Sequence, residues 1–210
     1  MSMITRRHFA AMTLALPLAA TSLNLAFAQD AAPAEKAPAE PPADIVLGSD
    51  DAPVTIVEYA SMTCPHCAAF HNGPFKDLKK DYIDTGKVKF ILREFPLDRL
   101  ALAVAVLARC KPEKYYDIVD LYFEQQQLWA TNDDPVSKMF SLAQQAGFSR
   151  EEFEACLNNR ELLEGIYANR TRGEQDGVTG TPTLFIDGEK YEGERTIAAL
   201  REVLDPKIDS

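Results

Sequence analysis

Two cysteines separated by two residues, Cys64 and Cys67, follow one short β-type stretch and precede a helical one. Residues 54–59 are rich in β-branched side chains, which favour strands, and residues 88–93 have the same character. A helical stretch lies between them, so this part of the chain predicts a βαβ unit in which the two strands run parallel. The Cys-x-x-Cys pair is therefore expected at the end of a strand and the start of a helix.

The start of a helix favours negative charge, because its first N–H groups are unpaired and the helix dipole has its positive end there. We therefore expect the pKa of Cys64 to be lowered, so that this residue attacks as a thiolate. Cys67 lies further into the helix and is expected to be the resolving thiol that releases a mixed disulfide. His66 can add positive charge or a hydrogen bond to the Cys64 thiolate, which would make the disulfide a stronger oxidant. A static structural disulfide is the alternative.

A zinc site is a second alternative for the close cysteine pair. His71 could supply a third ligand after Cys64 and Cys67, but no nearby Cys or His completes a tetrahedral set. We therefore predict no metal, and we expect His71 to be a polar residue on the helix that begins at the cysteines.

Beyond the βαβ unit the pattern is helical over residues 98–176, and strand character returns at 183–186. Helix starts are indicated at Pro112, at Asp134 with Pro135, and at Ser149 with Glu152. An Asp-Gly turn after residue 186 predicts a hairpin, and a last helix is expected from near Thr196. The sequence thus predicts an α/β fold whose mixed sheet is interrupted by a helical block.

Two further cysteines, Cys110 and Cys156, lie within this helical block. They lie 46 residues apart, Cys110 at the end of an apolar helical stretch and Cys156 in the helix that starts at Ser149, and we expect them to form a structural disulfide. Two isolated buried thiols are the alternative.

The first 28 residues have the features of a cleaved export leader. Arg6 and Arg7 precede an apolar run at residues 9–20, and small residues follow at 26–28. The paired arginines are similar to a twin-arginine signal, although the export route stays open. An uncleaved membrane anchor is the alternative to cleavage after residue 28.

Residues 29–43 consist mainly of Ala and Pro, so we expect a disordered or partly polyproline tether. The tether has no heptad or strand pattern, and we expect a monomer. The formal net charge of −10 at pH 7 argues against nucleic acid and anionic membranes as main ligands. The leader together with the paired cysteines predicts an oxidising compartment, most simply a bacterial periplasm.

The run Glu58-Tyr-Ala-Ser-Met-Thr-Cys64-Pro-His-Cys67, with Val178-Thr-Gly-Thr-Pro-Thr183 far downstream, resembles the DsbA family of thioredoxin-fold disulfide oxidoreductases. The resemblance implies a thioredoxin fold over residues 44–210 with a helical insertion at about 98–176. It also implies that Pro182 is cis and lies beside Cys64, and that Thr181 offers backbone groups to an extended substrate peptide. Glu58 is implied to lie buried under Cys67 and to help move its proton.

The function implied by this resemblance is a thiol oxidase that donates the Cys64–Cys67 disulfide to reduced exported proteins. Reoxidation by a quinone-linked membrane oxidase of the DsbB type is implied as well, and no cofactor is needed. A disulfide isomerase or reductase of the same fold is the alternative within this chemistry. A noncatalytic thioredoxin-like binding or chaperone module is the alternative from another class.

Overall fold

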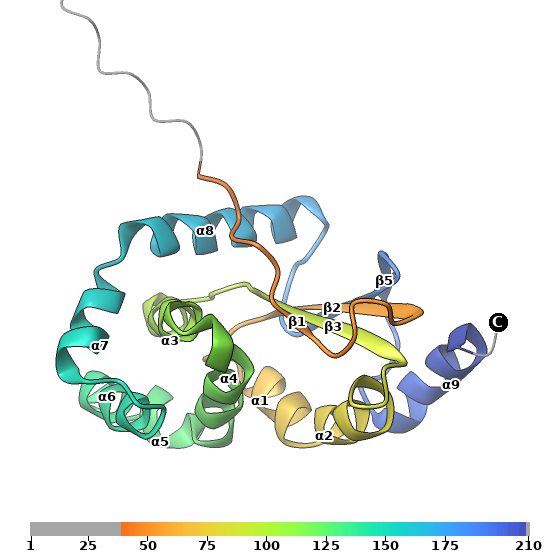
Figure 1. Cartoon of the computed structure of the whole chain (residues 1–210), viewed down its shortest axis with the longest axis horizontal. Coiled ribbons are helices and arrows are strands. Elements are labelled where there is room, and N and C mark those ends of the chain that lie inside the picture. Colours follow the sequence, from red (N-terminus) through yellow and green to blue (C-terminus); the bar gives the residue numbers. More distant parts are fainter. Residues whose placement is uncertain (1–38, 209–210) are drawn as a thin grey trace, which may run out of the picture. The chain divides into compact units, whose positions relative to one another are not determined.

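The computed structural model describes residues 39–208, which form a mixed sheet with helices on both faces (Figure 1). The predicted leader and residues 29–38 of the predicted tether lie outside the described residues. The sheet has five strands in the order β1-β3-β2-β4-β5. They are β1 (Val46–Leu47), β2 (Val54–Ala60), β3 (Val88–Glu94), β4 (Thr183–Ile186) and β5 (Glu189–Tyr191).

Strands β2 and β3 are parallel neighbours, as the βαβ pattern predicted, with Val54 opposite Val88 and Ala60 opposite Glu94. Strand β4 runs antiparallel to β2 and continues into β5 through the predicted hairpin. Both residues of its turn have positive φ, 51° at Asp187 and 83° at Gly188, as a type I′ turn requires. The short strand β1, antiparallel to β3, is absent from the sequence prediction.

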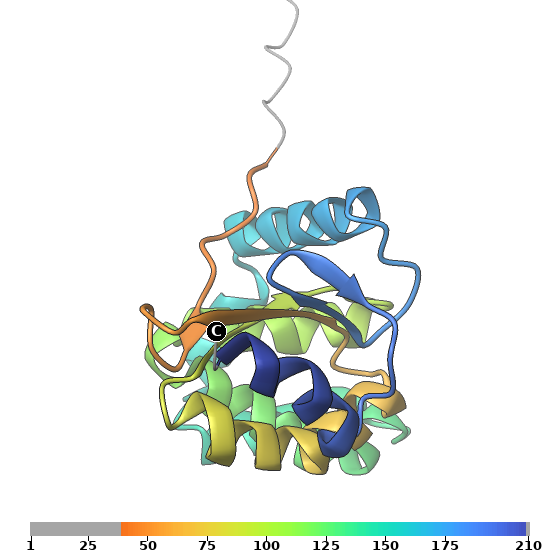
Figure 2. The same cartoon turned by 90° about the vertical axis from the view of Figure 1, so that its right-hand side faces the viewer.

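Helices cover the two faces of the sheet unequally. Helices α1 (Pro65–Asn72), α2 (Pro74–Leu78) and α9 (Ile197–Ile208) lie on one face, and α8 (Arg160–Gln175) lies on the other (Figures 1 and 2). A π-helical turn, η1 (Lys79–Ile83), extends α2 toward β3. Because β2 leads directly into α1, the cysteine pair lies at the edge where the parallel strands end.

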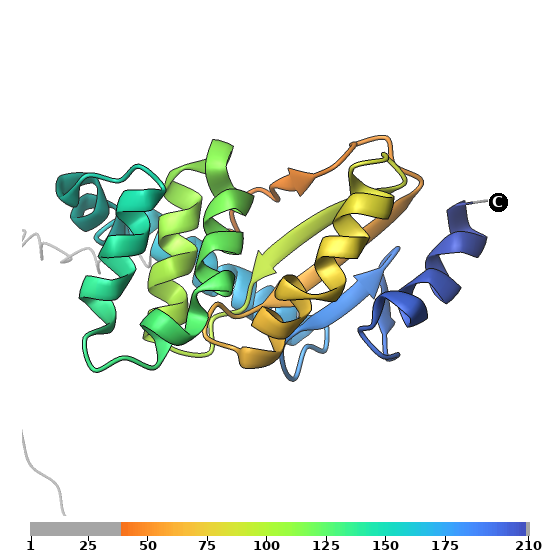
Figure 3. The same ribbon diagram turned by 90° about the horizontal axis from the view of Figure 1, so that it is seen from below.

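Most of the predicted helical block lies beyond one end of the strands, and its last helix, α8, runs over one face of the sheet (Figures 1 and 3). It comprises α3 (Arg99–Cys110), η2 (Pro112–Lys114), α4 (Tyr115–Glu124), α5 (Gln126–Ala130), α6 (Pro135–Gln145), α7 (Arg150–Leu157) and α8. The helix starts predicted at Asp134 and Ser149 are confirmed: Asp134 accepts a hydrogen bond from the N–H of Ser137, and Ser149 forms a reciprocal capping box with Glu152.

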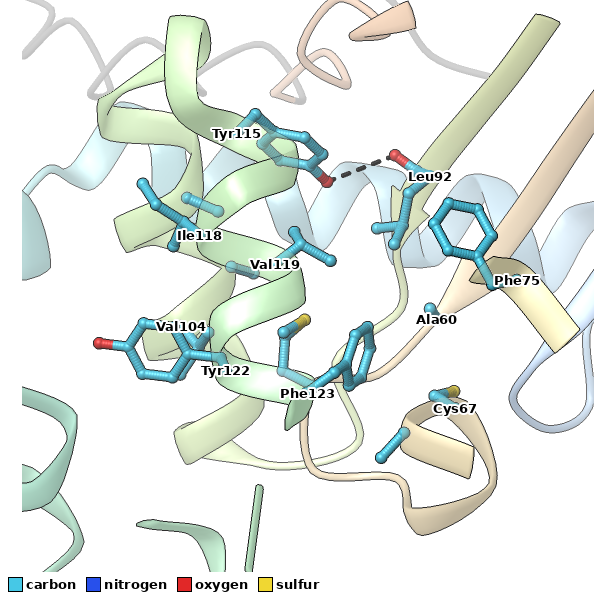
Figure 4. Packing of buried hydrophobic residues seen from close by; sticks show 14 of the residues in the cluster. Ala60, Cys67, Phe75, Leu92, Val104, Tyr115, Ile118, Val119, Tyr122 and Phe123 are labelled. Atoms are coloured by element: carbon cyan, nitrogen blue, oxygen red, sulfur yellow. Dashed lines mark hydrogen bonds between the residues drawn. The ribbon is translucent and has the colours of Figure 1, made fainter. Parts of the chain in front are cut away.

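The block and the sheet share one apolar core. Helix α4 contributes Tyr115, Val119 and Phe123, whose side chains point toward the sheet and toward α1 (Figure 4). The Tyr115 hydroxyl reaches the carbonyl of Leu92 on β3, at 3.4 Å, and the carboxylate of Glu94, at 2.7 Å. Burial of this shared surface holds the helical block in a fixed position against the active-site edge of the sheet.

A buried carboxylate fastens the block to the sheet. Glu94 accepts hydrogen bonds from the Arg109 guanidinium of α3, the Tyr115 hydroxyl of α4 and the Asn169 amide of α8. A buried charge is tolerated when it is paired and hydrogen-bonded, and this one has partners on three helices. The arrangement requires α3, α4 and α8 to meet at the end of β3.

A disulfide joins Cys110, the last residue of α3, to Cys156 on α7, with a Cα–Cα distance of 6.2 Å. The last residues of the predicted tether are attached to the fold, because the Arg109 guanidinium donates to the Ala43 carbonyl. The adjacent Asp44 pairs with Arg93 at 2.8 Å. Within residues 39–208 no helix combines the length and apolar character needed to cross a membrane.

Candidate active site

The backbone around the two close cysteines is set by the β2-to-α1 junction. Cys64 is the N-cap residue of α1, with extended φ and ψ, and its carbonyl accepts the N–H of Ala68 at 3.1 Å. Pro65 occupies the first helical position, where its missing N–H costs no hydrogen bond. The first free backbone N–H groups of the helix, from His66 and Cys67, both act on the Cys64 sulfur.

The two free thiols have opposite pKa shifts. The pKa of Cys64 is lowered to about 5, chiefly because the Cys67 thiol donates a hydrogen bond to the thiolate; burial opposes the shift, while Thr181 and the two backbone N–H groups add to it. The pKa of Cys67 is raised well above its usual range by burial, by its hydrogen bond to Cys64 and by the charge of Glu58. Cys64 is therefore the thiolate of the pair, and Cys67 holds the proton.

The loop before β4 completes the site from the far end of the chain. The Thr181–Pro182 peptide bond is cis, and the Cys64 thiol donates to the Thr181 carbonyl at 3.2 Å. Beside these residues lies a pocket of about 670 Å³, whose walls include His66, Phe70 and Pro182. The sulfur of Cys64 thus lies beside a groove with a backbone edge.

His66 is exposed on the wall of this pocket. Its backbone N–H helps to lower the pKa of Cys64, whereas no hydrogen bond joins its imidazole to the sulfur among the described contacts. The predicted effect of the His66 side chain on the Cys64 thiolate stays a prediction. The contribution of its backbone N–H to the lowered pKa follows from its place in the first turn of α1.

Glu58 lies on β2 with its side chain fully buried, and its charge acts on Cys67. Its Oε2 lies 2.8 Å from Nε2 of His71, which is itself buried. The expectation of an ordinary polar helix residue missed this pairing. The signal for it was the spacing, because His71 lies one helical turn after Cys67 and on the same face of the helix.

The described residues contain no group of three His, Cys, Asp or Glu side chains placed to hold a metal ion. His71 is engaged by Glu58, on the side of α1 that faces the core, and does not join Cys64 as a ligand.

Gln126, from α5 in the helical block, is a site residue that the sequence analysis missed. Its side-chain amide donates to the carbonyls of Met62, at 2.8 Å, and Cys64, at 3.0 Å. These hydrogen bonds hold the loop between β2 and α1 from a position sixty-odd residues away in sequence. No local pattern marks such a contact. The helical block therefore takes part in shaping the active-site loop.

This geometry suits thiol–disulfide exchange. A thiolate at Cys64 is both a nucleophile toward disulfides and a good leaving group, and Cys67 lies within hydrogen-bonding reach to close the intramolecular disulfide. The cis peptide bond at Pro182 places the Thr181 backbone beside the Cys64 sulfur.

Known proteins share this architecture. A family model described as Thioredoxin matches residues 40–206. A Rickettsia typhi protein that carries the name protein-disulfide oxidoreductase is 35% identical over 173 residues, which cover 80% of this chain and 64% of that protein. The chain thus spans a little less than two thirds of that relative. Disulfide bond formation protein D of Bacillus subtilis is 25% identical, over 78% of this chain and 76% of that protein.

Solved structures agree with the sequence comparisons. The crystal structure of alpha-DsbA1 from Wolbachia pipientis superposes with a TM-score of 0.74 at 30% identity, covering 80% of this chain and 92% of that one. The predicted thioredoxin fold with an inserted helical region is confirmed by these matches. The chain belongs to the DsbA family of thioredoxin-fold proteins.

Proposed function

We propose that this protein is a thiol:disulfide oxidoreductase of the oxidase type, which donates the Cys64–Cys67 disulfide to reduced exported proteins. The observation that carries the proposal is the unequal pair of thiols, with the pKa of Cys64 lowered to about 5 and that of Cys67 raised well above its usual range. The catalytic residues we assign are Cys64 and Cys67, with Glu58 and His66 acting on them.

The lowered pKa sets the direction of the reaction. At pH 7 a thiol with a pKa of about 5 has roughly a hundred thiolates for each thiol, whereas an ordinary cysteine is mostly protonated. Groups that stabilise this thiolate act only on the reduced form, so they favour reduction of the disulfide. An active-site disulfide that is readily reduced is a strong oxidant of other thiols.

The exchange proceeds in two steps. A client thiolate attacks Cys64, so that the Cys64–Cys67 bond breaks, a client–Cys64 bond forms, and Cys67 leaves and is protonated. A second client thiolate then attacks the client sulfur of the mixed disulfide, and Cys64 leaves as a stable thiolate. The client gains one disulfide and the enzyme gains two electrons.

The substrate-binding role falls to Thr181 and Pro182. Their backbone borders the pocket beside Cys64 and can pair with an extended client segment. The name of the Rickettsia relative supports disulfide chemistry in this family. For reoxidation we propose a quinone-linked membrane oxidase of the DsbB type. We also propose that the protein is exported to the periplasm and that its leader is cleaved after residue 28.

The proposal is tested with protein purified from the periplasm of an expressing bacterium. Equilibration with glutathione buffers should give a reduction potential more oxidising than about −200 mV, and a reduced two-cysteine peptide should be oxidised stoichiometrically. A Cys64→Ser variant is the control and should oxidise nothing. Faster repair of a scrambled disulfide substrate without net loss of thiols would identify an isomerase instead, and absence of any exchange would identify a binding module.

Cleavage of the leader is tested separately. Mass spectrometry of the purified protein should find Gln29 as the N-terminal residue.

A further inference from the structure

His71 lies in an apolar environment, where burying its two polar ring nitrogens costs free energy. A functional role would explain why a histidine is found at this position. Its ring is almost fully buried between Phe123, on which it is stacked, and Phe75, against which it is tilted, with ring centroids 4.4 Å away in both cases. A phenylalanine would fill such a sandwich without the cost of burying two polar nitrogens. One nitrogen is used: Nε2 lies 2.8 Å from Oε2 of Glu58.

Glu58 cannot exchange protons with water directly. Its side chain has no exposed surface, and Oε1 has no hydrogen-bond partner among the described residues. It acts electrostatically on Cys67, which is also sealed from solvent. A proton that Cys67 gains or loses through Glu58 therefore needs one more group to supply or accept it.

The other nitrogen of His71 faces Asp120. Nδ1 is buried without a hydrogen-bond partner and lies 3.7 Å from Oδ1 of Asp120, whose side chain is 40% exposed. This distance is too long for a direct hydrogen bond and suits a bridging water. A cavity of about 40 Å³ lies at this point, which is enough for a water molecule.

Charged groups from four neighbouring elements lie around the ring and its cavity. They are Glu58 on β2, Asp120 and Glu124 on α4, Lys76 on α2 and Lys79 on the adjoining η1. Lys76 is paired with Glu124 at 2.9 Å and Lys79 with Asp84 at 2.7 Å, so both lysine charges are neutralised at the surface. Asp120 is the acid that approaches Nδ1.

We propose that His71 supplies and takes back the proton of Cys67 through Glu58, with Asp120 beside its second nitrogen. The inference rests on the proposed function, and it places this proton donor on the side of α1 that faces α4, away from the client groove. The observations that carry it are the hydrogen bond to Glu58 on one nitrogen and the unpartnered second nitrogen at a water-sized cavity.

The proton balance closes over one catalytic cycle. When a client thiolate breaks the Cys64–Cys67 bond, Cys67 leaves as a thiolate and receives a proton through Glu58. The protonated His71 ring supplies that proton from Nε2 and becomes neutral, keeping its other proton on Nδ1 beside Asp120. During reoxidation the Cys67 thiol returns its proton along the same groups to Nε2. Because the two half-reactions run in opposite directions, the ring regains its starting charge without rotating in its aromatic sandwich.

The electrostatics of the ring agree with this role. Burial alone would lower the pKa of His71, but the charge of Glu58 and the contributions of Asp120 raise it to about 9. At neutral pH the ring therefore holds the proton that it can give to Cys67, stabilised by the acids on its two sides.

The experiment follows reduced enzyme mixed with oxidised glutathione, by acid quench and mass spectrometry. Cys64 first attacks glutathione disulfide and forms a mixed disulfide, releasing one glutathione. Cys67 must then lose its proton to attack the Cys64 sulfur, which releases the second glutathione. In His71→Gln the amide retains a donor for Glu58 but passes no proton. We expect an unchanged first step and a second step slowed by about tenfold or more at pH 7, with a rate that recovers as pH rises.

Two surface variants provide a matched pair. Asp120→Asn and Glu124→Gln each remove one negative charge from α4, but only Asp120 lies near Nδ1. We expect Asp120→Asn to slow the second step several-fold and Glu124→Gln to leave it unchanged. A His71→Gln second step within twofold of wild type at every pH, or equal effects of the two surface variants, would overturn the relay. Failure of the wild type to oxidise a client peptide, with normal glutathione kinetics, would refute the proposed function and not the relay.

Discussion

Replacing Cys67 with alanine is expected to raise the pKa of Cys64, because the Cys67 thiol is the largest contributor to its lowering to about 5. A hydrogen bond to a charged group contributes roughly 1.5–3 kcal/mol, and one pKa unit corresponds to about 1.4 kcal/mol. Loss of this donor should therefore bring the pKa of Cys64 to roughly 6 or 7. The remaining contributions, from the Thr181 side chain and the backbone N–H groups of the helix, keep it below the usual thiol range.

Serine at the same position is the matched control. Its hydroxyl is also a donor, so Cys67→Ser should leave the pKa of Cys64 near the wild-type value while Cys67→Ala raises it. The assay is the thiolate absorbance at 240 nm as a function of pH, supported by the pH dependence of alkylation by iodoacetamide. Equal pKa values in the alanine variant and the wild type would show that the helix terminus alone stabilises the thiolate, and would refute the reasoning.

Four further predictions concern the cysteines and His66. Cys67→Ser should accumulate mixed disulfides with clients and Cys64→Ser should not, as gels without reductant would show. Mixed disulfides in Cys64→Ser alone would make Cys67 the attacking cysteine and Cys64 the resolving one. An apolar residue at His66 should raise the pKa of Cys64 and lower the reduction potential in step; a potential that falls with no pKa change would place its action on the disulfide form. Replacing Cys110 and Cys156 with alanine should lower the free energy of unfolding by about 4 kcal/mol for a loop of 46 residues, with oxidase activity retained. Because the pKa of Cys64 is lower in the folded than in the unfolded protein, the Cys64 thiolate stabilises the reduced protein fully above the usual thiol pKa. This stabilisation is lost as the pH falls through about 5. Denaturant unfolding of reduced wild type and Cys64→Ser should therefore differ more at pH 8 than at pH 4.

The sequence determined the features that depend on neighbours a few residues apart. The β-branched run before Cys64, the capping box at Ser149 and the Asp187–Gly188 turn are each read from side chains that act on their own backbone. The helix N-terminus at Cys64 belongs to the same group, because strand, cysteine and proline follow one another directly. These local signals were sufficient for the parallel β2–β3 pair, and they led to the proposal that Cys64 is the nucleophile.

Short and isolated elements escaped prediction. Strand β1 has only two residues, too few for an alternating pattern, and it exists because β3 offers an open edge. The attachment of Ala43 and Asp44 likewise depends on Arg109 and Arg93, which belong to distant elements. The Ala/Pro-rich composition predicts that the tether is disordered when it has no partner. Here the buried Arg109 provides a partner for the Ala43 carbonyl.

Only the tertiary structure decided what surrounds the two sulfurs. The Thr181 carbonyl reaches Cys64 across 117 residues, and the Gln126 amide holds the Cys64 carbonyl across 62. The pairing of Glu58 with His71 depends on β2 and α1 packing face to face beneath α4, which turns a helix residue into a buried partner of the active site. Spacing along the chain carries no information about such contacts, because the folding of the whole sheet and helical block brings these groups together and excludes water from them.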